Sequence, residues 1–165
     1  MPESLTISSA VNSMWYVSTA SNVATKGDGS AAQADKDDDN EEQIWQFTAP
    51  TGGWTDVTDL TLSITATNDA SATTLIVRIK ADSTWTATDT VTTGTGGTMA
   101  DDTATWTGSW GAVTTFQVGV KTGSVSRPME PIEVDFLGLS IDGSTVVSSG
   151  VATLYYYENC LSRAI

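Results

Sequence analysis

The sequence predicts an all-β protein, most simply an antiparallel β-sandwich of jelly-roll type with about ten short strands. Three observations support this fold class. Apolar and polar residues alternate with a period of two along most of the chain. Clusters of Gly, Asp, Asn and Pro interrupt the alternation at intervals of about ten residues, and no window shows a sustained helical stripe with caps.

Two segments show the alternation most clearly. Residues 60–67 alternate Leu, Ile or Ala with Thr or Ser, as a strand with one buried and one solvated face requires. Residues 73–80 place Leu, Val and Ile on one face and Arg78 and Lys80 on the other. Turn-forming residues at 68–72 separate the two segments, so we expect them to pair as a hairpin. Further strands are expected at residues 11–19, 43–48, 83–93, 103–110, 113–121, 132–141, 144–148 and 151–157.

The strand expected at residues 132–141 carries an irregularity. Its apolar residues occupy alternate positions up to Phe136 and are shifted by one position from Leu137 onward. We expect a β-bulge near Gly138, because one extra residue in a strand restores the alternation on each side of it.

The chain is expected to form one domain with an N-terminal extension. A chain of 165 residues and 17.3 kDa can bury about two thirds of its surface, enough for one core without disulfides or metals. We expect residues 11–165 to form this β-sandwich, with a long acidic loop at residues 26–42. Residues 1–10 are polar apart from Leu5 and Ile7, which favours an arm that pairs with a neighbouring chain.

Missing residue types exclude much familiar chemistry. The sequence has no His, which excludes Ser-His-Asp and Cys-His triads, His general bases and metal sites that need His. Cys160 is the single cysteine, so no intrachain disulfide or multi-cysteine metal site can form. We expect Cys160 to be a small buried apolar side chain. These absences predict a protein that is not an enzyme and needs no cofactor.

Charge and hydropathy limit the expected partners. The first residues contain neither a basic segment nor a long apolar core, and no apolar run approaches the roughly 18 residues of a membrane span. We therefore expect a soluble protein without a membrane partner. The net charge is −13, and the seven basic residues are spread along the chain, so direct nucleic-acid binding is not expected.

The acidic loop is a weak candidate for a Ca²⁺ site. Four of its residues lie at or near the spacing of an EF-hand loop. They are Asp35, Asp37, Asp39 and Glu41. The match fails further along, because the sixth position is Asn40 where the EF-hand has Gly, and the twelfth is Gln46 where it has Glu. We expect a solvated acidic loop, with bound Ca²⁺ as the less favoured alternative.

Other carboxylates occur in and before the strand expected at residues 132–141. Glu133 and Asp135 share one strand face about 7 Å apart, and Glu130 lies close before them. A glycosidase needs two carboxylates about 5 to 10 Å apart across a sugar. The same spacing arises on any solvated strand face, so we expect a solvated face and no hydrolysis.

Tryptophans beside small polar residues are the remaining candidates for function. They are Trp54, Trp85, Trp106 and Trp110. In a domain with few Leu and Phe residues, core packing is the first expectation for these rings. Contacts with another subunit come second, and a platform that stacks on sugar faces comes third.

Taken together, these features are similar to those of accessory virion proteins of tailed bacteriophages, especially capsid decoration or cement proteins. The shared features are a Met-Pro start without a leader pattern, no disulfides, acidic charge, a β chain rich in Ser, Thr and Gly, and an N-terminal arm. The resemblance implies a β-sandwich, commonly trimeric, that sits on the outer capsid surface and contacts the major capsid protein. It implies synthesis in the host cytoplasm, a place in the virion, and no catalysis. The interface residues expected on this basis are Leu5, Ile7, Trp54, Trp106 and Trp110.

Two alternatives stay open. A carbohydrate-binding jelly roll would use the four tryptophans as a stacking platform, with Asp and Asn side chains binding sugar hydroxyls. Another phage structural role, in a head fibre or a tail, is also compatible with the composition. Binding to glycans or to capsids would separate these functions.

Overall fold

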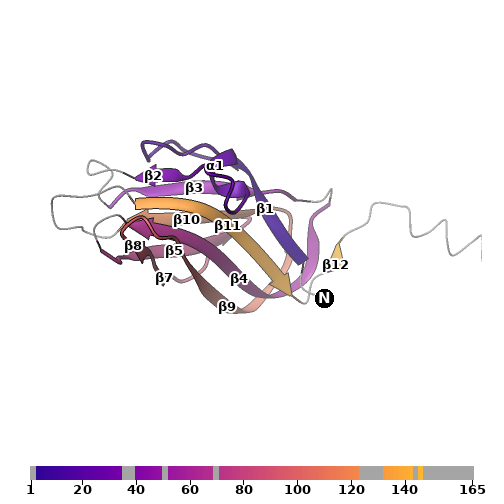
Figure 1. Ribbon diagram of the computed structural model, residues 1–165. Coiled ribbons are helices and arrows are strands. Elements are labelled where there is room, and N and C mark those ends of the chain that lie inside the picture. Colours follow the sequence, from indigo (N-terminus) through magenta and orange to yellow (C-terminus); the bar gives the residue numbers. More distant parts are fainter. Residues whose placement is uncertain are drawn as a thin grey trace, which may run out of the picture.

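Figure 1 shows the computed structural model of the chain, which describes residues 3–34, 40–49, 52–68, 71–122, 132–142 and 145–146. In these ranges the chain forms twelve strands and one short helix, so the all-β prediction is confirmed. The elements in chain order are β1 (Glu3–Ala10), α1 (Ser21–Ala24), β2 (Ala32–Ala34), β3 (Glu42–Phe47), β4 (Trp54–Asn68), β5 (Thr74–Ala81), β6 (Thr84–Trp85), β7 (Asp89–Thr92), β8 (Gly94–Thr95), β9 (Ala100–Val113), β10 (Phe116–Thr122), β11 (Ile132–Asp142) and β12 (Thr145–Val146).

One layer of the molecule, here called sheet A, contains β9, β4, β11 and the first half of β1. The long strand β4 pairs antiparallel with β9 along one edge and with β11 along the other. β11 in turn pairs with residues 3–6 of β1, and its first residues pair with β2. The short strands β8 and β12 pair with the two ends of β4.

The second layer, sheet B, contains the second half of β1 followed by β3, β10 and β5, with the short strands β6 and β7 on the far edge of β5. β1 leaves β11 after Thr6 and pairs with β3 from Ile7, so this one strand belongs to both sheets. Figure 1 shows β4 and β11 lying in front of β10 and β5, as the two layers of a sandwich.

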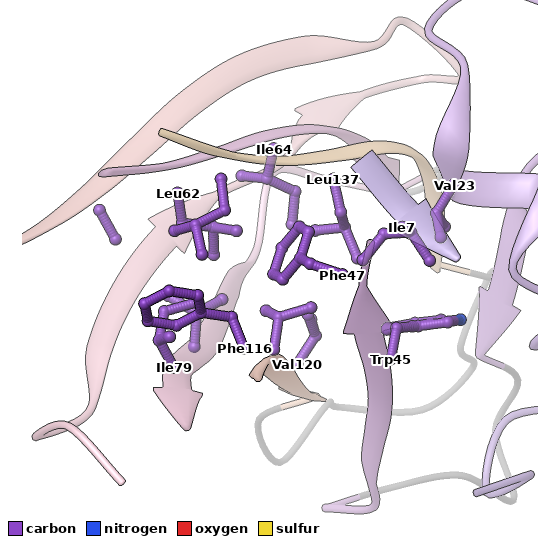
Figure 2. Packing of buried hydrophobic residues seen from close by; sticks show 14 of the residues in the cluster. Ile7, Val23, Trp45, Phe47, Leu62, Ile64, Ile79, Phe116, Val120 and Leu137 are labelled. Atoms are coloured by element: carbon purple, nitrogen blue, oxygen red, sulfur yellow. The ribbon is translucent and has the colours of Figure 1, made fainter. Parts of the chain in front are cut away.

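The hydrophobic core lies between the two sheets. Figure 2 shows Leu62 and Leu137 of sheet A on one side of the core and Phe116 and Val120 of sheet B on the other. Aromatic pairs extend it: the ring centroids of Trp15 and Trp45 lie 5.5 Å apart at 88°, and those of Trp54 and Phe116 lie 5.2 Å apart. Period-two alternation therefore supplies one apolar face per strand, and the two sets of apolar faces bury each other.

A buried amide attaches the segment after β1 to this core. The side chain of Gln43 is fully buried, and its Oε1 accepts hydrogen bonds from the backbone N–H groups of Met14 (2.9 Å) and Trp15 (3.2 Å). Its Nε2 donates to the carbonyl oxygen of Asn12 at 2.7 Å. Residues 11–19 were expected to form a strand. They form a loop because Gln43 and a single bridge between Val17 and Gln33 satisfy their backbone groups.

The N-terminal segment is not an arm, which corrects the expectation for residues 1–10. Residues 3–10 form β1 inside the sandwich, where Leu5 and Ile7 are buried at 6% and 5% exposure. Both β11 and β3 offer an edge to pair with, and two apolar side chains on one strand face suffice to join the core. Leu5 and Ile7 are therefore core residues and do not reach out to a neighbouring subunit in this structure.

The expected hairpin of residues 60–67 and 73–80 is also wrong. Both segments are strands, but β4 pairs with β9 and β11 in sheet A, whereas β5 pairs with β10 and β7 in sheet B. Their apolar faces pack across the core, so the chain between them crosses from one sheet to the other. Strand positions were predictable here from periodicity, but strand partners were not.

The bulge in β11 occurs earlier than expected. The register shifts between Val134 and Phe136, so Asp135 is the extra residue, whereas the sequence predicted a bulge near Gly138. Gly138 serves packing instead: a Cβ added there would lie 2.7 Å from the ring of Phe136, which covers it. The expected strands at residues 144–148 and 151–157 lie outside the described residues except for β12.

Candidate functional site

The four candidate tryptophans fall into two pairs. Trp54 and Trp106 are buried at 1% and 8% exposure, and the indole N–H of Trp106 donates to the carbonyl oxygen of Ala87 at 2.9 Å. The structure thus places these two rings in the core, where they offer no indole face to a partner. Trp85 and Trp110 are only partly buried, and each lies at a different surface.

Trp110 lines a pocket at one end of the sandwich, here called the Trp110 pocket. The pocket has a volume of about 300 Å³ and lies between the β5–β6 turn and the end of β9. Its lining residues are Ala81, Asp82, Ser83, Thr84, Ser109, Trp110, Ala112 and Val113. This volume is at the small end of the range of about 300–1,000 Å³ typical of small-molecule sites.

Besides the Asp82 carboxylate, the polar rim of the Trp110 pocket comes from three hydroxyl side chains. Ser83, Thr84 and Ser109 are all exposed. In the part of the chain that the structure describes, none of the three hydroxyls has a side-chain hydrogen bond. Hydroxyls both donate and accept, so these groups are available to a polar ligand that rests on the indole of Trp110.

Asp82 fixes the two turns that form the pocket walls. Its Oδ1 accepts hydrogen bonds from Thr114 (N–H, 3.0 Å; Oγ1, 2.6 Å) and from Thr115 (N–H, 2.9 Å), while its own N–H donates to the carbonyl oxygen of Thr115. Partial burial acts to raise the pKa of Asp82, but the hydrogen bonds from Thr114 and Thr115 outweigh it and lower the pKa below its usual value. The carboxylate is therefore ionised at neutral pH and ties the β5–β6 turn to the β9–β10 turn.

Trp85 lies on a second surface, the outer face of sheet B. Its ring is covered by the guanidinium of Arg78, whose Cζ lies 4.0 Å from the ring centroid. Arg78 also donates two hydrogen bonds to the carboxylate of Glu42, from Nε to Oε1 (2.7 Å) and from Nη2 to Oε2 (2.5 Å). Hydrogen bonding of Arg78 to the Glu42 carboxylate is the main cause that raises the pKa of Arg78 above its usual value. The indole of Trp85 on β6, the guanidinium of Arg78 on β5 and the carboxylate of Glu42 on β3 thus form one connected row.

A glycine makes room for this row. Gly119 lies opposite Arg78 on β10, and a Cβ at this position would lie 2.2 Å from Oε1 of Glu42. Without a side chain there, the Glu42 carboxylate lies flat over β10 and reaches Arg78 on β5. The register places the amides of Gln46 and Gln117 beside this row, 3.3 Å apart.

The other residues singled out from the sequence do not form a site in the described ranges. Asp35, Asp37, Asp39, Glu130 and Cys160 lie outside the described residues. The backbone oxygen of Glu41 accepts a hydrogen bond from the indole N–H of Trp15 (3.3 Å). No group of three or more carboxylate or thiol side chains that could hold a metal occurs among residues the structure describes. In the same ranges, no helix is long and apolar enough to cross a membrane.

Glu133 and Asp135 do not form the pair that their spacing suggested. The bulge at Asp135 breaks the alternation between them, so Glu133 is half-buried whereas Asp135 is buried at 6% exposure. Glu133 accepts a hydrogen bond from Gln33 (2.7 Å), and Asp135 accepts one from the backbone N–H of Gly27 (2.8 Å). Each carboxylate therefore holds a neighbouring segment, and the shared face expected for a glycosidase is absent at these two residues.

Sequence reasoning missed both Asp82 and the basic cluster of sheet B. Arg78 and Lys80 were already expected on one strand face, but Lys121 joins them only through the pairing of β10 with β5. The pocket depends on two turns that are distant in the sequence, and no local pattern predicts that they meet.

Comparison with known proteins gives weak similarities. No protein-family model matches the chain, and no curated protein matches its sequence. Among solved structures, a CBM4 structure is 19% identical over 61% of this chain and 71% of its own, with a TM-score of 0.40. A CBM22-1 xylan-binding domain from Paenibacillus barcinonensis Xyn10C is 9% identical over 84% of this chain and 92% of its own, with a TM-score of 0.35.

A phage protein is also among these similar structures. The enzymatically active domain of tailspike protein 4 from bacteriophage CBA120 is 10% identical, with a TM-score of 0.42. The match covers 86% of this chain but only 19% of the tailspike chain. The structural neighbours thus include two carbohydrate-binding modules and one phage domain, all with low similarity to this chain.

Proposed function

We propose that this protein is a non-catalytic carbohydrate-binding module that takes one sugar ring of a neutral glycan in the Trp110 pocket. A single observation carries the proposal: a pocket of about 300 Å³ combines the partly buried indole of Trp110 with the hydroxyls of Ser83, Thr84 and Ser109. The partly exposed ring and the surrounding hydroxyls match the two kinds of surface that a sugar has.

The chemistry of a pyranose ring explains the match. Its C–H face is apolar and stacks on an aromatic ring, while its edge carries hydroxyls that donate and accept hydrogen bonds. Ala112 and Val113 add apolar lining beside Trp110, and the hydroxyl side chains lie on the rim. A preformed pocket with an apolar wall and a few polar groups is the usual form of a small-molecule site.

Rigidity of the pocket favours binding. Asp82 joins the two turns by several hydrogen bonds, so the walls are already fixed before a ligand enters. Preorganisation lowers the entropy cost of binding, which matters most for weak ligands such as single sugars.

The test is binding of a panel of neutral glycans, followed by tryptophan fluorescence and calorimetry. For a glycan that binds, Trp110→Ala should weaken affinity about tenfold or more, equivalent to about 1.4 kcal/mol. Because Trp110 is partly buried, Ser109→Tyr provides a second variant that fills the pocket from an exposed position. Trp85→Phe on the other surface is the matched control and should bind normally. Unchanged binding by both pocket variants, or no neutral ligand in the panel, would overturn the proposal.

A second candidate function, capsid decoration as part of a virion, is favoured by three exposed apolar side chains that are close together in the sequence. Val11, Met14 and Tyr16 follow β1 and are exposed at 48%, 42% and 75%, and they are the large hydrophobic side chains exposed in the described ranges. Grouped apolar side chains at a surface mark contacts with other proteins. On this proposal Val11, Met14 and Tyr16, and not residues 1–10, contact the major capsid protein or another copy of the chain, as in a trimer.

Co-sedimentation with undecorated phage capsids tests this second function, with light scattering to give the oligomeric state. Decoration predicts stoichiometric binding that is lost when Val11, Met14 and Tyr16 are each replaced by Ser. If the protein binds glycans but not capsids, capsid decoration is excluded and the carbohydrate-binding function stands.

A further inference from the structure

The outer face of sheet B gathers most of the positive charge that the structure describes. The central strands β3, β10 and β5 contain four charged residues: Glu42, Arg78, Lys80 and Lys121. All four alternate with buried neighbours and therefore lie on the outer face, where they sum to a charge of +2. Lys26, the other basic residue in the described ranges, is paired with Asp101 at 2.6 Å. A local excess of positive charge thus stands out in a chain with a net charge of −13.

The register explains how residues far apart in the sequence form this face. Lys80 lies opposite Gln117 on β10 and opposite Trp85 on β6. Lys121, at the other end of the same strands, lies opposite Ile76 on β5 and opposite Glu42 on β3. The outer face therefore runs from an indole and a lysine at one end to a second lysine at the other.

Two of the three cations form no salt bridge in the described ranges, since the Glu42 carboxylate opposite Lys121 is bound to Arg78. Arg78 is paired with Glu42, but neither Lys80 nor Lys121 has a carboxylate oxygen within 4.0 Å among the described residues. Lys80 lies instead on the same ring as Arg78, with its Nζ 5.7 Å from the centroid of Trp85. Because Glu42 already neutralises Arg78, the charge of Lys80 is left without a counter-ion, which an anion bound beside it would supply.

We infer that the outer face of sheet B binds an acidic polysaccharide, with Lys80 and Lys121 contacting its carboxylates and the Gln46 and Gln117 amides contacting its sugar rings. This site is separate from the Trp110 pocket and does not depend on it. The amides can donate to and accept from sugar hydroxyls, while the indole of Trp85, beside Lys80, reports binding through its fluorescence.

Charge density favours an acidic sugar polymer over nucleic acid. Double-stranded DNA carries one charge per about 1.7 Å of its axis, which a chain with a net charge of −13 repels strongly. A polymer with one carboxylate per sugar has a much lower charge density. Two unpaired lysines several residues apart can match such widely spaced carboxylates, but they cannot neutralise a phosphate backbone.

Polygalacturonate is the probe, and its methyl-esterified form is the matched neutral polymer. Binding is followed by calorimetry and by the fluorescence of Trp85, which is compared with a Trp85→Phe variant. We expect the acid form to bind and the ester not to bind. Affinity should fall as salt is raised from about 0.01 M to about 0.15 M, because the Debye length shortens from about 30 Å to about 8 Å.

Charge-matched variants locate the site. Lys80→Gln and Lys121→Gln each remove one exposed charge, and together they should lower the affinity about tenfold. Lys26→Gln removes the same charge from another surface and should bind polygalacturonate normally. Trp110→Ala should also bind it normally, which separates this site from the proposed neutral-glycan pocket.

Three outcomes would overturn the inference. The first is equal loss of binding in Lys26→Gln and the sheet B variants, which would show a general charge effect. The second is equal binding of the acidic and esterified polymers. The third is binding of a DNA duplex with no binding of polygalacturonate, which would assign the lysines to a different class of partner.

Discussion

The outer face of sheet A presents short hydroxyl side chains, whereas the outer face of sheet B presents long charged and amide side chains. On sheet A, Thr61 faces Thr105 across β4 and β9 with their Oγ1 atoms 3.5 Å apart, and Ser63 pairs with Thr103. Both faces come from the same period-two alternation. Periodicity therefore predicts where a solvated face lies, while the length and charge of its side chains decide what that face can bind.

Each face also contains a glycine beneath a larger side chain. Gly138 of sheet A lies under the ring of Phe136, and Gly119 of sheet B lies under the carboxylate of Glu42. In sheet A the covered glycine serves packing within one strand. In sheet B it lets a charged group cross a strand and reach Arg78, so the same local feature has a structural use on one face and an electrostatic use on the other.

Removing the strand that both sheets share should have the largest effect. Deletion of residues 1–10 should abolish cooperative unfolding, because it removes a central strand and exposes the edges of β11 and β3, a loss comparable to a domain's whole stability of about 5–15 kcal/mol. Thermal unfolding followed by circular dichroism measures this. Single Leu5→Ala and Ile7→Ala variants should each cost about 2–5 kcal/mol. A deletion variant that melts like the intact chain would show that β1 is a dispensable arm after all.

The covered glycines should give smaller and distinguishable effects. We expect Gly138→Ala to destabilise by about 1–3 kcal/mol, because the new methyl group overlaps the ring of Phe136. Gly119→Ala should cost about 1 kcal/mol or less, because the flexible Glu42 side chain can move away and lose only its pair with Arg78. Urea unfolding gives the free energies. In a Glu42→Ala background, Gly119→Ala should cost nothing further, since the clash is then absent. An equal cost of Gly119→Ala in both backgrounds would mean that Glu42 does not lie over Gly119.

Replacing Arg78 by Lys should cost about 1 kcal/mol or less. A lysine keeps the charge but cannot form both hydrogen bonds to Glu42, and this pair is only half-buried. Lys80→Arg, two residues further along the same face of β5, is the control and should leave stability unchanged. An equal cost for both changes would show that the bidentate geometry contributes nothing.

The smallest effect concerns acid pH. The pKa of Asp82 is lowered in the folded protein, so its stabilising contribution is present above the unfolded pKa of about 3.9 and is lost as pH falls through the folded value. Asp82→Asn should therefore lower stability at neutral pH and flatten its decline in acid. Unfolding curves at several pH values test this, and an unchanged pH profile would contradict it.

Much of the fold was predictable from local patterns, but pairing was not. The alternation around Leu62 and Val77 located β4 and β5, while nothing in either segment shows that they belong to different sheets. The same applies to Leu5 and Ile7, whose weak apolar pattern forms a central strand only because two other strands offer their edges. Register is a property of the assembled sheets, so a single strand cannot reveal it.

The candidate sites were predictable only in part, for the same reason. Trp110 was one of the aromatic candidates, but Asp82 and the turn that complete its pocket come from a distant segment. Trp54 and Trp106 have similar local sequences to Trp110, and only packing decides that they are buried. Periodicity placed Arg78 and Lys80 together, whereas Lys121 needed the β5–β10 register.

The place of β1 has a consequence for synthesis on the ribosome. β1 is made well before its partner residues on β11, because Glu3 lies opposite Ile141. Chains emerge from the N-terminus, and such distant pairings form late and slowly. Leu5 therefore stays without its partner Leu139 until β11 has been translated, whereas Ile7 can pair with Phe47 of β3 much earlier. The edge of sheet A between β1 and β11 can close only after β11 has been made.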